Sequence, residues 1–117
     1  MSEDYAICIS DFEEELNSLF IGGLEFKLTC LACPEQYDVF LDGVQVAYVR
    51  LRHGFLRVWV PDCDDDDNLI YTHEFDDGWK GTFDSDEERF DYLYEIAKII
   101  KKKVMQDILD VFKGDDI

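Results

Sequence analysis

The stretch Val44–Pro61, with the sequence VQVAYVRLRHGFLRVWVP, constrains the fold of this chain more than any other. It contains no acidic residue, although the whole chain carries a formal charge of −17. Apolar and polar side chains alternate on both sides of His53-Gly54, and a glycine at that place supplies the positive φ that a two-residue turn requires. The stretch therefore predicts a β-hairpin with its turn at His53-Gly54.

Pairing across this turn gives the hairpin two unlike faces, because successive side chains of a strand point to opposite sides. One face is apolar and predicts the core: Ala47, Val49, Leu51, Leu56, Val58 and Val60. The other face is aromatic and basic: Tyr48, Arg50, Arg52, Phe55, Arg57 and Trp59. Arg50 opposite Arg57 is an unfavourable pair unless carboxylates or a ligand compensate. This second face is either covered by the N-terminal segment and paired with carboxylates, or it is a binding surface.

The residues before the hairpin predict an acidic helical segment over 1–23 and the beginning of a sheet over 24–75. Ser10 or Asp11 is a suitable N-cap for a helix that runs to Phe20, and Gly22-Gly23 is a suitable end. Further strands are predicted on either side of the hairpin, at Leu24–Leu31, Gln36–Leu41 and Leu69–Phe75. Asp42-Gly43 predicts another tight turn.

The residues after the sheet predict a long C-terminal helix over 85–113. Ser85 and Glu88 form a capping box, and a stripe of apolar residues follows at spacings of three and four: Phe90, Leu93, Tyr94, Ala97, Ile100, Val104, Ile108 and Val111. Trp79 and Phe83 are expected to hold the preceding loop to the body. The predicted fold class is α+β, with an antiparallel meander of four to five strands packed against the long helix and a short N-terminal helix. The whole chain, 1–117, is expected to be one domain.

The charge and composition narrow the possible partners. The chain has 28 acidic and 11 basic residues, and 47% of it is hydrophobic, which is enough for a core. No apolar run is long enough to span a membrane, and the first residues lack the features of a secretory signal, so a cytoplasmic protein is expected. The charge repels nucleic-acid phosphates and anionic lipid, so direct nucleic-acid binding is not expected, whereas a basic protein partner is favoured.

The cysteines and the acidic residues give little support for a metal or cofactor site. Cys30 and Cys33 form a CxxC motif, but zinc sites usually need a second ligand pair, and a redox motif should lie between a strand and a helix. Reduced thiols at the end of a strand are the favoured interpretation. Counting an EF-hand loop from Asp62 places Asp67 at position six and His73 at position twelve, where glycine and glutamate are required. We expect no metal and no cofactor.

Catalytic motifs are also missing from the sequence. There is no nucleophile elbow, no HExxH and no phosphate-binding glycine loop. His53 is assigned to a turn and His73 to a strand, and carboxylate pairs are too abundant to be diagnostic. We therefore expect a binding protein and not an enzyme.

Several segments resemble small uncharacterised acidic proteins of phages and prophages of Gram-positive bacteria. They are Pro34–Val39 (PEQYDV), Asp42-Gly43, Val49–Gly54 (VRLRHG) and Val60–Asp62 (VPD), followed by an acidic turn and a helix at Phe83–Arg89. The similarity covers roughly residues 34–105. It implies a phage-related origin and no catalytic residues, whereas the first 30 residues and the tetra-aspartate run differ from the pattern.

The acidic residues are concentrated in the second half of the chain. Residues 62–91 contain thirteen acidic residues against Lys80 and Arg89. Carboxylates held on a surface imitate phosphates and compete for Arg and Lys contacts. The predicted partner-binding residues are Asp64, Asp65, Asp66, Asp67, Asp84, Asp86, Glu87 and Glu88.

Together with the phage resemblance, this acidity predicts an inhibitor that mimics nucleic acid and blocks a host defence nuclease, of the anti-CRISPR or anti-restriction type. The alternative is a small nucleic-acid-binding or structural interaction module. It would use the other predicted face, with Tyr48, Arg50, Arg52, Arg57 and Trp59 as its contact residues.

Overall fold

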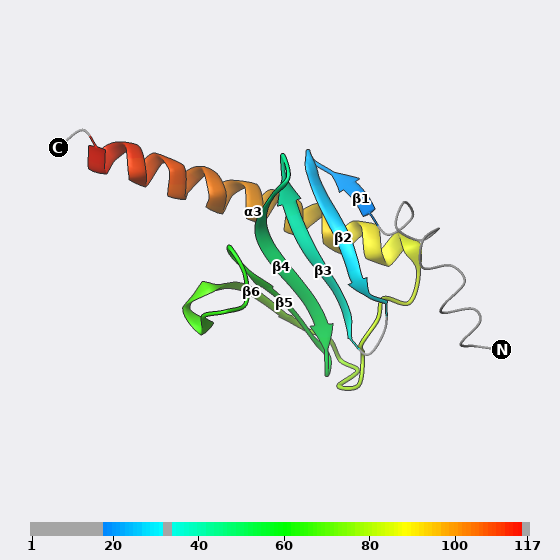
Figure 1. Ribbon diagram of the computed structural model, residues 1–117. Helices are drawn as coiled ribbons and strands as arrows, with labels where there is room; N and C mark the ends of the chain where they lie inside the picture. The colour runs from blue at the N-terminus through cyan, green and yellow to red at the C-terminus, as the bar shows by residue number, and fades with distance from the viewer. Residues whose placement is uncertain (1–17, 32–33, 116–117) are drawn as a thin grey trace.

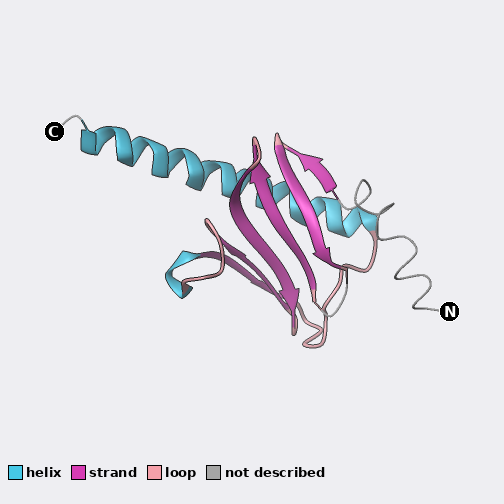
Figure 2. Ribbon diagram, in the orientation of Figure 1, coloured by secondary structure: helices cyan, strands magenta, loops and turns pink. Residues whose placement is uncertain are grey.

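A six-stranded antiparallel sheet with one long helix across it forms the described part of the protein, residues 18–31 and 34–115 of a computed structural model (Figures 1 and 2). The strands pair in chain order: β1 Ser18–Ile21, β2 Leu24–Cys30, β3 Glu35–Leu41, β4 Val44–Arg52, β5 Phe55–Trp59 and β6 Leu69–Glu74. A 3-10 turn, η1 (Asp66–Asn68), precedes β6, and the helix is α3 (Asp86–Asp115). The α+β class is confirmed, but the sheet has six strands and not four to five.

The predicted hairpin register is confirmed for five residue pairs. Tyr48 pairs with Trp59, Arg50 with Arg57 and, at the end nearest the turn, Arg52 with Phe55. His53 and Gly54 both have positive φ, 53° and 80°, as this kind of tight turn requires. A side chain at Gly54 would also approach the carbonyl oxygen of Asp77 to 2.7 Å, because the loop after β6 packs against this turn.

The core lies between one face of the sheet and the first half of α3. The predicted apolar face of the hairpin is buried in full, and α3 contributes Leu93, Ile96, Ala97 and Ile100. Phe90 and Tyr94, which the sequence placed on the same stripe, are exposed. The helix is rotated relative to the predicted stripe, so Ile96 faces the sheet in their place.

The loop between β6 and α3 is held by one of the two predicted aromatic residues. Phe83 is buried and stacks on Tyr92 of α3, with ring centroids 5.7 Å apart. Trp79 is 86% exposed, so the prediction for this residue is wrong. Lys80, between them, is buried against its partners at the start of α3.

The prediction that the N-terminal helix runs to Phe20 is wrong. Residues 18–20 belong to the edge strand β1, and Gly22-Gly23 is the turn of a β1–β2 hairpin in which Ile21 pairs with Leu24. The spacing of Leu19 and Phe20 fits a helix as well as a strand over so few residues, which explains the error. The rest of the predicted helix lies outside the described residues.

Candidate functional site

The predicted acidic residues of the β5–β6 loop are all exposed. Asp64, Asp65, Asp66 and Asp67 lie on a loop that is ordered by its own carboxylates. The backbone N–H of Asp67 donates to the side chain of Asp65 (2.9 Å), and that of Asp64 donates to the side chain of Asp62 (3.0 Å). These bonds define the path of the backbone and leave the outer carboxylates in solvent.

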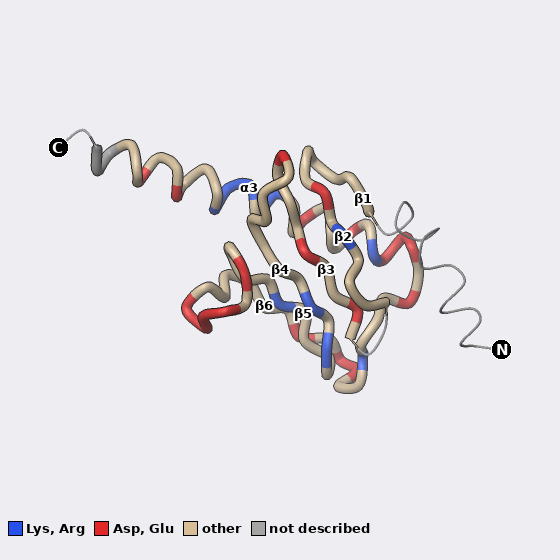
Figure 3. Tube along the Cα trace, in the orientation of Figure 1, with Lys and Arg blue, Asp and Glu red and all other residues tan. Residues whose placement is uncertain are grey.

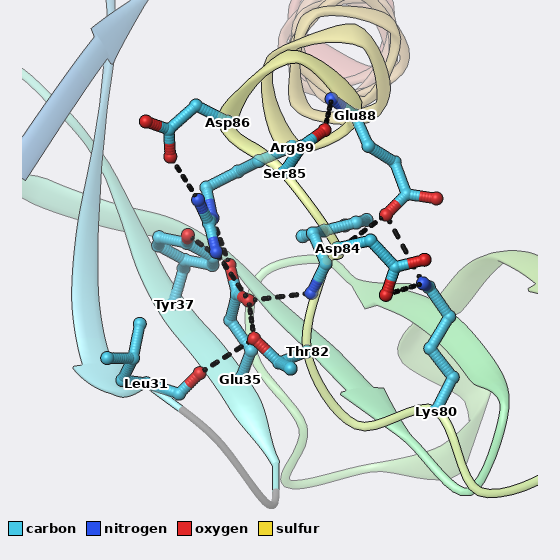
Figure 4. Close-up of polar contacts among 11 residues, drawn as sticks. Leu31, Glu35, Tyr37, Lys80, Thr82, Asp84, Ser85, Asp86, Glu88 and Arg89 are labelled. Carbon is cyan, nitrogen blue, oxygen red and sulfur yellow. Dashed lines mark hydrogen bonds and ion pairs between the residues drawn. The ribbon is translucent and has the colours of Figure 1, made fainter.

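The predicted acidic residues at the start of α3 are partly used within the molecule (Figure 4). Lys80 Nζ contacts Asp84 (3.0 Å) and Glu88 (3.2 Å), and the Glu88 carboxylate also accepts from the backbone N–H of Asp84. The N–H of Glu88 donates to Ser85 Oγ, which confirms the predicted capping by Ser85. Asp86 is 87% exposed, but its carboxylate contacts Arg89. Of the four predicted residues at the start of α3, only Glu87 has no ion pair with another described residue.

The two acidic groups do not form one surface. Pro61, next to the β5–β6 loop, lines a groove together with Val111 near the far end of α3. Asp86 begins the same helix, and the rise from Asp86 to Val111 is about 37 Å at 1.5 Å per residue. Figure 3 shows the acidic loop and the start of α3 on opposite sides of the molecule. A partner must therefore span the whole protein to contact both.

A buried glutamate joins the sheet to the start of α3, and sequence reasoning missed it. Glu35, at the first position of β3, has a fully buried carboxylate that accepts from Arg89 Nε (2.7 Å), the Tyr37 hydroxyl (2.6 Å), the Thr82 hydroxyl (2.7 Å) and the Phe83 N–H (3.0 Å) (Figure 4). Its two oxygens are thus saturated with donors, as a buried charge requires.

The electrostatics of Glu35 are those of a structural ion pair. Burial on its own raises the pKa of this carboxyl, but the hydrogen bonds from Arg89, Tyr37, Thr82 and Phe83 outweigh burial and hold the pKa below its usual range. Burial and the Glu35 charge raise the pKa of the Tyr37 hydroxyl. Glu35 and Tyr37 belong to the PEQYDV segment and Arg89 ends the Phe83–Arg89 segment, so the ion pair joins two segments that are far apart in the sequence.

An arginine pocket occupies the face of the sheet that α3 does not cover. We use this name for the concave site of about 280 Å³ lined by Arg50, Arg52, His53, Phe55 and Arg57. Arg50 and Arg57 are directly opposite on β4 and β5, as predicted. Figure 3 shows basic positions on β4 and β5, toward the turn that joins these two strands. The strand pairing therefore places like charges side by side within an acidic protein.

Aromatic rings support the two central arginines. The Arg50 guanidinium lies over the Trp59 ring, 4.9 Å from its centroid, and that of Arg57 lies over the Phe55 ring at 4.4 Å. Trp59 is only 6% exposed and also contacts the ring of Tyr48. Trp59 is therefore not available for base stacking, in contrast to the alternative prediction. It positions Arg50 instead.

The arginine pocket has no internal counter-ion among the described residues. The ion pairs of the described segments involve Lys80, Arg89, Lys98 and Lys103, and none involves the arginines of the pocket. Within the described segments Arg89 is thus the one arginine with a carboxylate partner, whereas the three arginines on neighbouring positions of β4 and β5 have none. Such a cluster is unfavourable unless an anion binds to it.

Cysteines, possible metal ligands and membrane-spanning helices can be compared with the predictions only within the described residues. Cys30 is partly buried at the end of β2 and Cys63 is exposed, whereas Cys33 lies outside the described residues, so the CxxC motif is not described as a pair. Within residues 18–31 and 34–115, no three His, Cys, Asp or Glu side chains are grouped as metal ligands. No helix in the same segments has the length and apolar character needed to cross a membrane.

Comparisons with protein-family models, with curated proteins and with solved structures found no match to this chain. The function is therefore inferred from the residues and their geometry, and the phage resemblance stays a prediction.

Proposed function

We propose that this chain is a binding protein, not an enzyme, and that its arginine pocket binds one phosphate-bearing group of nucleotide size. The observation that carries this proposal is the absence of a carboxylate partner for Arg50, Arg52 and Arg57 among the described residues. Guanidinium groups match the geometry of phosphate oxygens and bind them through paired hydrogen bonds.

The form of the pocket limits the size of the ligand. A volume of about 280 Å³ is near the lower limit of small-molecule sites, and it suits one phosphoryl group with an attached ring. The chain's charge of −17 opposes a long polyanion, whereas the field of distant carboxylates acts weakly on a small ligand because salt screens it over about 10 Å. The aromatic supports hold both guanidinium groups in place before the ligand arrives.

Removing the charge of Arg50 or Arg57 is expected to weaken nucleotide binding at least about tenfold, since a hydrogen bond to a charged group contributes roughly 1.5–3 kcal/mol. The variants are Arg50→Gln and Arg57→Gln, measured by isothermal titration calorimetry with guanosine and adenosine monophosphates. Both variants should stay folded, because both side chains lie on the open face.

Two controls make this test specific. Lys27→Gln removes an exposed charge from β2 and should leave nucleotide affinity unchanged. The nucleosides, which lack the phosphate, should not bind the parent protein. Equal binding of nucleoside and nucleotide, or unchanged affinity in both arginine variants, would refute the proposal. Binding of an eight-nucleotide strand in place of single nucleotides would favour the nucleic-acid module predicted from the sequence.

A second candidate function keeps the acidic inhibitor predicted from the sequence, of phage origin and acting in the host cytoplasm. The supporting observation is that Asp64–Asp67 are exposed, take no part in the ion pairs of the described segments and lie on a backbone held by two side-chain hydrogen bonds. Carboxylates at fixed positions compete with phosphates for a basic protein such as a defence nuclease. The acidic group at the start of α3 is too distant to contribute to a compact contact.

Replacing Asp64, Asp65, Asp66 and Asp67 by Asn is expected to slow association with a basic partner more than it speeds dissociation. Surface plasmon resonance at several salt concentrations measures both rates. The matched control replaces Asp84, Asp86 and Glu87 by their amides, at the distant start of α3, and should change the association rate less. An unchanged rate and salt dependence in the four-Asn variant would assign the loop to solubility alone.

A further inference from the structure

The strand β6 forms one edge of the sheet, and no strand of the described residues lies beyond it (Figure 1). The Phe75 N–H donates to the Gly54 carbonyl oxygen across the β5–β6 pair (2.8 Å). Because bonded and non-bonded residue pairs alternate between antiparallel strands, Thr72 and Glu74 direct their backbone N–H and C=O groups away from β5. Both residues are exposed. Their outward backbone groups are therefore available to a strand from another molecule.

A groove lies beside this edge, between β6 and α3. Every second side chain of an added strand would point toward α3 and into this groove, because side chains alternate between the faces of a sheet. The groove has a volume of about 460 Å³ and is lined by Ile70 and Tyr71 from the strand and by Ile99, Lys102, Lys103 and Gln106 from the helix. The strand side of this lining is apolar and the helix side carries lysines, so the side chains that enter should be apolar and not basic.

Both loops that flank β6 are acidic. Residues 62–68 contain five aspartates and residues 74–77 contain three acidic residues, whereas residues 62–79 contain no lysine or arginine. All of these acidic side chains except Asp62 are exposed, and none takes part in an ion pair of the described segments. The free backbone edge therefore lies between two concentrations of negative charge.

These charges indicate what can occupy the edge. A second copy of β6 would bring acidic residues together in either direction. Antiparallel pairing places Asp66-Asp67 of one copy beside Asp76-Asp77 of the other, and parallel pairing places each loop beside its own equivalent. The acidic loops thus oppose self-association, which is a common role of charges at edge strands. A strand with basic residues at both of its ends is attracted at both.

We propose that β6 binds an extended basic segment of another protein as a seventh strand of the sheet. The backbone of the segment pairs with Thr72 and Glu74, its alternate apolar side chains enter the groove beside α3, and its lysines or arginines contact the acidic loops at the two ends. The proposal rests on the second candidate function, in which a basic partner binds Asp64–Asp67. It adds the conformation of that partner and a place of contact outside the loop.

The probe for this proposal is a nine-residue peptide with two lysines at each end and alternating valine and threonine between them. Hydrogen exchange of the full chain, followed by NMR, is expected to slow at the Thr72 and Glu74 amides when the peptide binds, because both become donors between strands. The Tyr71 and His73 amides serve as references, since these residues alternate with the outward pair and already face β5.

Two methylated peptides test the backbone pairing. The residues that bond to Thr72 and Glu74 point to the same face of the sheet as these two, which is the face opposite to α3, so they are the threonines when the valines enter the groove. N-methylation of the threonines should weaken binding at least about tenfold, because it removes donors between the strands. N-methylation of the valines is the matched control and should leave affinity close to that of the parent peptide.

Variants of the protein separate strand pairing from attraction by charge. Thr72→Pro removes one outward N–H at a place where an edge strand tolerates proline, and it should weaken peptide binding while circular dichroism shows a retained fold. Replacing Asp66 and Asp67 by Asn should weaken binding and reduce its salt dependence. The matched control replaces Glu87 and Asp91, two exposed acidic residues of α3, by their amides and should change binding less.

Several results would overturn the seventh-strand proposal. Peptide binding with unchanged exchange at Thr72 and Glu74, or equal affinity of the two methylated peptides, would show attraction by the acidic loops without strand pairing, and the second candidate function would stand without this proposal. Absence of peptide binding would also overturn it, and the four-Asn variant then tests the second candidate function on its own. Slower exchange at both amides with rising protein concentration and no peptide would assign the edge to a second copy.

Discussion

Arg89→Met is expected to destabilise the protein by about 3–5 kcal/mol, because it leaves the carboxylate of Glu35 buried without its cation. That loss is a large part of the roughly 5–15 kcal/mol that stabilises a domain. Urea unfolding followed by circular dichroism measures it. Lys98→Met removes the exposed Glu95–Lys98 pair from the same helix and should cost at most about 1 kcal/mol.

A double variant separates the cost of an unpaired buried charge from the loss of the Glu35–Arg89 ion pair itself. Replacing Glu35 by Leu and Arg89 by Met together should cost less than Arg89→Met alone, since no unpaired charge remains. The pKa of Glu35 is lowered in the folded state, so its stabilising effect is present above the usual glutamate pKa and is lost as pH falls through the folded-state pKa. Glu35→Gln should remove this part of the acid sensitivity. Equal effects of Arg89→Met and Lys98→Met would contradict the structural role of the pair.

Leu51→Asp and Val58→Asp are each expected to unfold the protein. Both side chains are fully buried between the hairpin and α3, and an isolated carboxylate there costs more than the stability available. Circular dichroism and thermal melting measure the effect. Val44→Asp, at the exposed start of the same strand, is the matched control and should melt close to the parent. A cooperative melt of Leu51→Asp at the parent temperature would contradict the observed register.

The hairpins were predictable from sequence because short-range chemistry determines them. A glycine at the second turn position fixes the place of the bend at His53-Gly54 and at Asp42-Gly43, and period-two alternation then assigns each side chain to a face. The arginine face followed from this register alone. The support of Arg50 by Trp59 did not, because strand alternation says which face a ring is on and not whether another side chain covers it.

Other elements depend on contacts between distant segments, which the sequence pattern does not reveal. β1 has four residues, too few for a period to distinguish strand from helix. Glu35 is an ordinary polar residue in the sequence, and its burial follows from Arg89, 54 positions later. The separation of the two acidic groups depends on the length of α3 and the place where the sheet meets it. These features could be found only after the sheet and helix were assembled.

The arginine pocket is the central claim, and the side-chain Nε–Hε resonances of its arginines test it most directly. The chain has four arginines, and Arg89, which donates to buried Glu35, serves as an internal reference. On titration with guanosine monophosphate, we predict that the NMR signals of Arg50 and Arg57 shift with saturation while that of Arg89 stays in place. Unmoved signals for both arginines, or the same shifts with guanosine alone, would contradict phosphate recognition by this pocket.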